Sequence, residues 1–300
     1  DLHASLAPSE MCIRDSYGII VQTIGNVYEV YVEEIAVRKN VEYSEIRKWG
    51  SIGFGCVVLL SGTIILKYGF KTMHIIGIIM SCIVILLIAM KFKNIEADGN
   101  PNRGKLIAVF KNKNSVILGI INILIIGTYT AIEFAYSTYL IEITGNADLA
   151  NSIYSKSIFS RVCVEFISFM LVGKYLKDKK PKKYLIIAFL IGTTRILLFS
   201  TGSIPLVVLG DQLHGLMYGC YLTFLFKYIR EVVDDELVAG TYSFVSVLGS
   251  AGANFVYPHM FSTIQRNFGY TAMYLVGFSI MVISLLVSIK ILPNGKKVQV

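Results

Sequence analysis

Long apolar segments separated by short polar connections fill the chain from residue 17 onwards. A helix needs about 20 residues, at roughly 1.5 Å each, to cross a hydrocarbon core about 30 Å thick. The apolar segments reach that length. The pattern therefore predicts nine membrane-spanning helices, over residues 17–37, 50–69, 72–91, 115–141, 152–175, 183–201, 204–229, 236–263 and 270–291.

The segment 204–229, IPLVVLGDQLHGLMYGCYLTFLFKYI, is apolar yet contains Asp211 and His214. An ionisable side chain at the centre of a bilayer costs about 2.5–3.5 kcal/mol, so it must face protein or water. Asp211, His214 and Tyr218 are three and four residues apart and share one helical face. We expect that face to form one wall of a polar cavity inside a helical bundle. The imidazole could relay protons or only accept a hydrogen bond, and the sequence leaves both roles open.

The first segment carries a polar stripe. Gln22, Asn26, Glu29 and Glu33 recur at offsets of four, seven and eleven residues, the period of one helix face. The stripe indicates a second cavity wall with Glu29 deepest in the segment, although a solvated helix end would give the same pattern. Arg47 begins the next helix, where an arginine either sets topology or belongs to a site.

Three other apolar segments contain charged residues. Glu133 lies between two tyrosines on one face of 115–141. Arg161 and Glu165, four residues apart in 152–175, could neutralise each other. Arg195 lies in the middle of LIIAFLIGTTRILLFS with no acid on its own helix, so it requires a partner from another helix.

Composition identifies an integral membrane protein. Hydrophobic residues make up 54% of the chain and charged residues 16%, with a mean hydropathy of +0.63, whereas soluble domains carry about 25% charge. The net charge of +8 does not indicate nucleic acid, because the basic residues lie between apolar segments. They gather in alternate connections, which predicts a cytoplasmic C-terminus in the cell inner membrane. We expect a monomer whose partners are the lipid bilayer and a small-molecule solute.

The five cysteines are scattered over positions 12, 56, 82, 163 and 220, without a CxxC pair or a histidine at ligand spacing. This spacing predicts neither a disulfide framework nor a metal site. The sequence also lacks HExxH, paired metal-binding acids and a serine–histidine–aspartate set. We therefore expect neither an enzyme nor a cofactor.

The polar stretch 93–114 separates three predicted helices from six and is expected to be a cytoplasmic linker. Residues 17–92 would then form a partial N-terminal half, and residues 115–300 a six-helix C-terminal half. Residues 1–16, DLHASLAPSEMCIRDS, lack the features of a signal peptide and resemble translated sequencing-adaptor sequence. We expect them to be a non-native leader.

Four stretches together resemble the lactose-permease-like oligosaccharide:proton symporters of the major facilitator superfamily. They are NVYEVYVEEIAVRKNVEYSEIRKWGSIGFG (26–55), TTRILLFS (193–200), DQLHGLMYGCYLTFLFKYI (211–229) and FGYTAMYLVGF (268–278). The resemblance covers nearly all of residues 17–292 and aligns them with the family's helices four to twelve. It implies a helical bundle of twelve membrane helices, of which nine are present and three N-terminal ones are absent.

The resemblance implies that Glu29 and Arg47 bind sugar hydroxyl groups. A carboxylate accepts hydrogen bonds from hydroxyls, while a guanidinium donates them in a fork. Phe54 lies at the position of the family's sugar-stacking tryptophan and offers a smaller apolar face.

The resemblance also implies a proton-coupling network, with H+ as the coupling ion. Glu165 matches the carboxylate that links sugar binding to proton movement, and Arg195 and His214 match other members of the network. The family carries a proton-binding glutamate three residues after the histidine, where this chain has Met217, which cannot titrate.

Two intramembrane acid–base pairs of the family are also changed. One is replaced by Thr130 and Ser250, which leaves no charge behind. The other appears as Glu133 and Asp211, two acids without the base, and two nearby carboxylates cannot both ionise cheaply in a low-dielectric site. Our hypothesis from the sequence is that Asp211 binds the coupling proton, in place of the glutamate that the family has at the position of Met217.

These observations predict a proton-coupled symporter that moves an oligosaccharide or related small sugar by alternating access. Alternatives within transport are a carrier for a nucleoside or an aromatic acid, and a uniporter without proton coupling. A different class, a non-transporting membrane sensor or an inactive fragment, also stays open.

Overall fold

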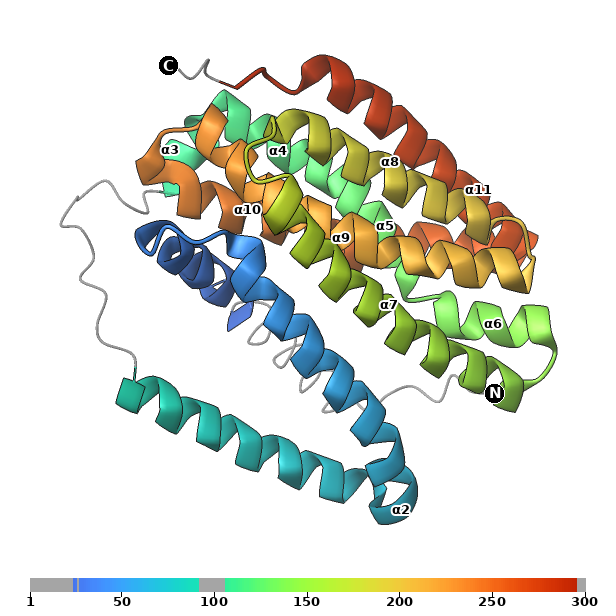
Figure 1. Ribbon diagram of the computed structural model, residues 1–300. Coiled ribbons are helices and arrows are strands. Elements are labelled where there is room, and N and C mark those ends of the chain that lie inside the picture. The colour runs from blue at the N-terminus through green and yellow to red at the C-terminus, as the bar shows by residue number, and fades with distance from the viewer. Residues whose placement is uncertain (1–23, 26, 92–105, 296–300) are drawn as a thin grey trace.

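The computed structural model describes residues 24–25, 27–91 and 106–295, and helices are the only regular secondary structure in these ranges (Figure 1). The predicted leader and the predicted linker up to residue 105 lie outside the described residues. The described helices pack into a bundle, which confirms the prediction of an all-α helical bundle.

The N-terminal part consists of a helix over residues 27–38 and the long helix α2 (Tyr43–Lys91). Gly69 has φ 78° and ψ 168°, so α2 is two helices joined at a bend. Glycine adopts positive φ without steric cost, which explains why the bend lies there. The bend agrees with the predicted boundary between the segments 50–69 and 72–91.

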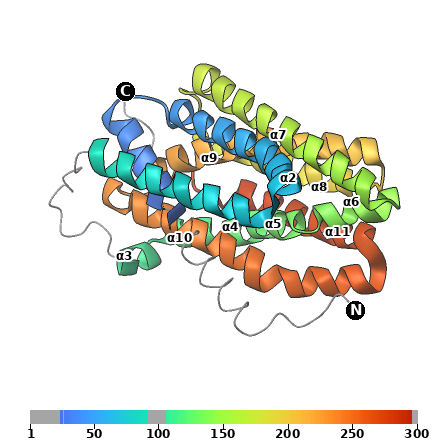
Figure 2. The same ribbon diagram turned by 90° about the horizontal axis from the view of Figure 1, so that it is seen from below.

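The two halves of α2 have different surroundings. The first half runs beside α7 in both views (Figure 1, Figure 2). The second half stands away from the bundle, and its apolar stretch Lys71–Met90 has a mean hydropathy of 2.7 with 0% of that window buried. A continuous apolar surface of this kind suits lipid or another apolar surface rather than water.

The predicted helix 115–141 is interrupted. After the short α3 (Leu106–Lys111), the chain forms α4 (Lys113–Asn122), the π-helical turn η1 (Ile123–Gly127), α5 (Thr128–Glu133) and α6 (Tyr136–Thr144). The prediction of one continuous helix over 115–141 is therefore wrong, because apolar residues continue through the break and hide it. π-helical turns are frequent at functional sites, and α5, which follows this one, ends at Glu133.

The rest of the chain follows the predicted segments more closely. Its elements are α7 (Ala147–Tyr175), α8 (Pro181–Phe199), α9 (Ile204–Val232), η2 (Asp235–Leu237), α10 (Val238–Ala251), η3 (Gly252–Val256) and α11 (Tyr257–Ile291). A bend at Gly269, with φ 82°, divides α11 at the predicted boundary between 236–263 and 270–291.

Three described stretches are long and apolar enough to cross a membrane by length and composition alone, namely Lys71–Met90, Lys113–Glu133 and Asp235–Ile291. α7, α8 and α9 fall outside that set and carry most of the charged residues of the site. The total of nine membrane helices stays a prediction.

Helix α9 packs between α7 and α8. At Gly215 the backbones of α7 and α9 touch, since a methyl group added there would lie 2.5 Å from Glu165 N and 2.7 Å from Arg161 O. Such a close approach requires a glycine. It holds two helices at a fixed spacing beside the predicted site.

Several basic connections meet at one end of the bundle, which we call the basic end. Lys227 Nζ donates to the Lys177 carbonyl at 2.7 Å. Lys182 Nζ donates to the Leu292 carbonyl at 2.6 Å. Connections predicted to share one side of the membrane thus lie together, and the assignment of that side as cytoplasmic stays a prediction.

Candidate functional site

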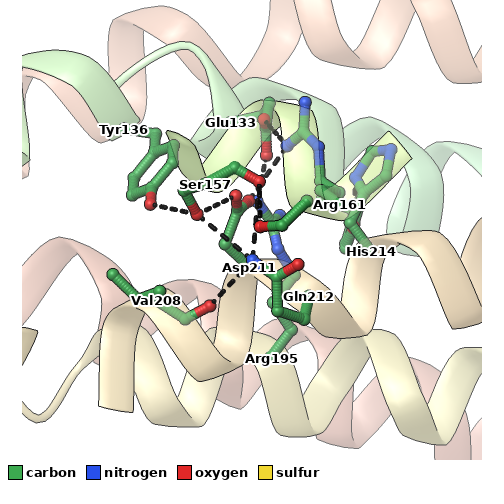
Figure 3. A network of polar contacts seen from close by, with 11 residues as sticks. Glu133, Tyr136, Ser157, Arg161, Arg195, Val208, Asp211, Gln212 and His214 are labelled. Atoms are coloured by element: carbon green, nitrogen blue, oxygen red, sulfur yellow. Dashed lines mark hydrogen bonds and ion pairs between the residues drawn. The ribbon is translucent and has the colours of Figure 1, made fainter. Parts of the chain in front are cut away.

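Four charged side chains, two of them fully buried, form a group that we call the four-charge cluster: Glu133 of α5, Arg161 of α7, Arg195 of α8 and Asp211 of α9 (Figure 3). Arg161 Nη1 lies 2.5 Å from Glu133 Oε1 and 3.0 Å from Asp211 Oδ1. Arg195 Nη2 pairs with Glu133 Oε2 and lies 3.1 Å from Asp211 Oδ1. Each arginine bridges both acids, so two positive and two negative charges balance.

This arrangement corrects two interpretations of the sequence. Glu133 and Asp211 are not acids without a base, because α7 and α8 each supply a guanidinium. Arg161 was considered as a partner of Glu165 on its own helix, but it turns to the cluster. Sequence spacing reveals partners on one helix only, and here the partners lie on different helices.

Hydroxyl groups complete the surroundings of Asp211. Ser157 Oγ donates to Asp211 Oδ2 at 2.6 Å, and Tyr136 OH donates to Ser157 Oγ at 3.2 Å (Figure 3). Burying an ion costs several kcal/mol unless good pairing and additional hydrogen bonds compensate. Asp211, at 0% side-chain exposure, has both. Ser157 could not be singled out from the sequence, because a lone serine in an apolar segment carries no signal.

Aromatic rings connect His214 to the cluster. Arg195 Cζ lies 4.6 Å from the ring centroid of Phe199 and 4.9 Å from that of Tyr129. Tyr129 OH is 2.7 Å from His214 Nδ1, and the imidazole stacks on Tyr218 with ring centroids 5.4 Å apart. His214 therefore reaches the charges through Tyr129, an arrangement compatible with a relay and with a simple hydrogen bond.

Glu29 and Arg47 form the predicted pair at a second place. Arg47 Nε donates to Glu29 Oε1 at 2.9 Å, and Tyr43 OH donates to Glu29 Oε2. The two charged side chains are 18% and 19% exposed. Phe54 follows Arg47 by seven residues on the same face of α2, and 55% of its surface is exposed. An ion pair and a free aromatic face are thus available on one side of α2.

Glu165 lies where α2 meets α7. Ser51 Oγ of α2 donates to Glu165 Oε1 at 2.7 Å, a hydrogen bond between residues 114 positions apart. Glu165 is 9% exposed. Within the part of the chain that the structure describes, no ion pair involves this carboxylate. Its direct partner is therefore a neutral hydroxyl.

These groups follow one another along two helices. On α2, Ser51 is one turn beyond Arg47; on α7, Arg161 is one turn from Glu165. One turn of four residues rises about 6 Å. A polar path therefore runs from the Glu29–Arg47 pair, across the α2–α7 contact, to the four-charge cluster.

Met217 lies away from this path. It is 1% exposed, and a methyl group added at Gly192 of α8 would lie 3.5 Å from both Met217 Cγ and Met281 Cε. The position that the resemblance aligns with a proton-binding glutamate therefore has apolar surroundings, which suit a methionine.

Among the described residues, no group of three or more histidine, cysteine or acidic side chains could hold a metal ion. The described cysteines, Cys56, Cys82, Cys163 and Cys220, are free thiols.

Comparisons with known proteins agree with this architecture. No curated protein sequence matches the chain. Its fold is similar to that of the human organic anion transporter MFSD10 (TETRAN), with a TM-score of 0.50 and 14% identity over 58% of this chain. The chain spans 40% of that transporter's chain, and at this identity the likeness concerns the fold alone. Residues 11–256 match the MFS_1 like family. The chain thus belongs to the MFS_1 like family of the major facilitator superfamily.

Proposed function

We propose that this protein is a proton-coupled symporter that carries an oligosaccharide or related small sugar across the cell inner membrane by alternating access, with the basic end in the cytoplasm. Membership of the major facilitator superfamily indicates a secondary transporter. The observation that carries the finer proposal is the polar path between the Glu29–Arg47 pair and the four-charge cluster. Charged groups in membrane helices are costly, so they are rare, pair inside the bundle and commonly mark solute or proton pathways.

The charge count along the path favours a neutral solute that travels with a proton. The path contains four carboxylates and three guanidinium groups: Glu29, Glu133, Glu165 and Asp211, with Arg47, Arg161 and Arg195. With every group ionised the sum is −1, and one bound proton makes it zero. Because moving uncompensated charge through a low-dielectric region is expensive, the protonated, solute-loaded protein is the form suited to reorientation.

Glu165 is the carboxylate best placed to bind this proton. Asp211 and Glu133 are each paired with two arginines, so a proton on either acid would break established ion pairs. Among the described residues, the direct partner of Glu165 is the neutral hydroxyl of Ser51. This geometry favours Glu165 over Asp211, which the sequence suggested as the carrier. Since the Ser51–Glu165 hydrogen bond joins α2 to α7, a change at Glu165 directly affects the contact between the two parts of the chain.

The solute class is inferred from the Glu29–Arg47 pair and Phe54. The pair combines acceptors and donors for hydroxyl groups, and the ring offers a flat apolar face, as a sugar requires. A nucleoside is the second candidate, because the half-buried rings of His214 and Tyr218 could stack on a base. The human transporter of similar fold is named for organic anions. An anion would add to the negative sum on this path, so we rank it lower.

Transport by the full-length protein in proteoliposomes tests the proposal, with a panel of labelled di- and trisaccharides and a nucleoside. We expect sugar accumulation driven by an inward proton gradient. Glu165→Gln should abolish accumulation but retain exchange of internal for external sugar, because a neutral amide removes the titrating group and keeps the fold. Asp211→Asn serves as the comparison: it should lower stability, because Arg161 and Arg195 each lose a partner, while the folded protein should retain coupling.

Three results would overturn this function. Accumulation of no sugar, sugar uptake indifferent to the proton gradient in the wild type, or full coupling in Glu165→Gln would each contradict it. The second result would indicate a uniporter. Coupling that is lost in Asp211→Asn and retained in Glu165→Gln would indicate that Asp211 binds the coupling proton.

A further inference from the structure

Tyr43 occupies one side of the carboxylate that the solute is proposed to use. Its hydroxyl donates to Glu29 Oε2, while Arg47 Nε donates to Oε1. Both oxygens of Glu29 are thus engaged from within the protein. A solute hydroxyl that donates to Oε2 must compete with the phenol, which is 5% exposed.

The ring of Tyr43 also belongs to the contact between the N-terminal part and α9. Its centroid lies 5.0 Å from that of Phe226. Phe226 in turn stacks on Tyr242 of α10, with centroids 4.0 Å apart and planes at 15°. The same phenol therefore touches the solute-binding acid with its hydroxyl and the C-terminal half with its face.

Two ion pairs flank this aromatic contact. Lys227 Nζ lies 2.6 Å from Glu42 Oε2. Arg230 binds Glu33 through two parallel hydrogen bonds, Nε to Oε1 and Nη2 to Oε2, each 2.7 Å long. We call these two pairs, together with the Tyr43–Phe226 contact, the closing contact. It joins the N-terminal part to α9 at the basic end.

We propose that Tyr43 is a positioning residue that makes opening of the basic end depend on solute binding at Glu29. In the empty protein its hydroxyl holds Glu29, and its ring supports the closing contact. A solute hydroxyl replaces the phenol on Oε2, the ring loses its anchor beside Phe226, and the closing contact weakens. The proposal rests on the proposed function, because it requires a hydroxylated solute at Glu29.

Tyr43→Phe tests this directly, since it keeps the ring and removes only the hydroxyl. We expect KM for sugar to fall about tenfold, because a competing hydrogen bond to a charged group is lost. Vmax should fall as well, because solute no longer controls the opening. A tyrosine with a merely structural role would not lower KM. Tyr28→Phe, the same change at an exposed position beside Glu29, should leave both parameters unchanged.

A second measurement needs no solute. Ala239, Glu33 and Arg230 line a cavity of about 310 Å³ next to the closing contact. In a protein whose native cysteines are replaced by serine, a cysteine introduced as Ala239→Cys reports opening through its reaction rate with a membrane-impermeant maleimide. Without solute, Tyr43→Phe should raise that rate about tenfold, and Tyr28→Phe should not.

The two measurements separate the proposals. If the wild type accumulates no sugar, the proposed function fails, while the labelling rate still decides the role of Tyr43 at the basic end. If the wild type transports sugar and Tyr43→Phe matches it in KM, Vmax and labelling, the proposal for Tyr43 is overturned and the function stands.

Discussion

The four-charge cluster and the Glu29–Arg47 pair are built from the same chemistry and differ in how many partners each acid has and in how deeply their innermost charges are buried. In the cluster, Arg195 and Asp211 are 0% exposed, Arg161 is 11% and Glu133 20% exposed, and each acid has two guanidinium partners. The side chains of the Glu29–Arg47 pair are 18% and 19% exposed, and Glu29 also accepts a hydrogen bond from the Tyr43 hydroxyl. Buried ions without partners are expensive, whereas partly exposed ions can exchange partners at low cost.

The difference separates two tasks along one polar path. The cluster fixes the mutual positions of α5, α7, α8 and α9, since four helices supply its charges. The Glu29–Arg47 pair holds groups that a solute can recruit. Glu165, on α7 between them, accepts a hydrogen bond from one neutral group among the residues that the structure describes, the Ser51 hydroxyl, and belongs to neither arrangement. Its protonation can therefore change without dismantling either one.

The largest effect on stability should come from breaking an ion pair in the four-charge cluster. Arg195→Gln leaves Glu133 and Asp211 with one arginine, and breaking a buried pair costs about 3–5 kcal/mol. We expect a corresponding loss in the free energy of unfolding, measured by denaturant titration in detergent micelles. The double variant Arg195→Gln with Glu133→Gln removes one charge of each sign and should recover part of the loss. Unchanged stability in the single variant would contradict a structural role for the cluster.

A smaller effect should follow from separating the helices that support the path. Gly215→Ala places a methyl group 2.5 Å from Glu165 N, and overpacking of this kind costs about 1–3 kcal/mol. Thermal unfolding in micelles measures it. Gly77→Ala is the matched control, because a methyl group there meets nothing within 4 Å and alanine favours a helix. Equal melting temperatures for the two variants would show that α7 and α9 separate without strain.

The accessible pair should respond in affinity and not in stability. Glu29→Gln removes a charged acceptor, so KM for sugar should rise about tenfold while the unfolding midpoint stays close to that of the wild type. Glu142→Gln, the same change at an exposed position near the opposite end, should alter neither. A large loss of stability in Glu29→Gln would make this pair a second structural cluster.

The smallest effect on stability is expected at an ion pair between neighbouring turns of one helix. Arg38 Nη2 lies 2.9 Å from Glu34 Oε1, four residues apart, and the two side chains are 39% and 26% exposed. Such pairs contribute about 0.3–0.5 kcal/mol, so Arg38→Gln should shift the unfolding free energy by no more than that. A change in the free energy of unfolding as large as that of Arg195→Gln would show that burial does not explain the different costs of breaking these ion pairs.

The sequence by itself determined the helices, the membrane environment and the grouping of the basic connections. The length of an apolar run is a local property, so the segments 183–201 and 204–229 reappear as α8 and α9 with ends shifted by a few residues. It also identified the unusual residues, because a charge in a membrane segment is costly wherever it lies. The break after Glu133 escaped it, because no glycine or proline marks it in the stretch AIEFAYSTYL.

Only the tertiary structure decided which charges meet. Arg161 lies 28 positions from Glu133 and 50 from Asp211, and Ser51 lies 114 from Glu165. No periodicity within one helix encodes such distances. They depend on which helix faces pack together, and therefore on close approaches such as that at Gly215. The same dependence explains why Tyr43, one aromatic residue among many, gained a role only when packing placed it between Glu29 and Phe226.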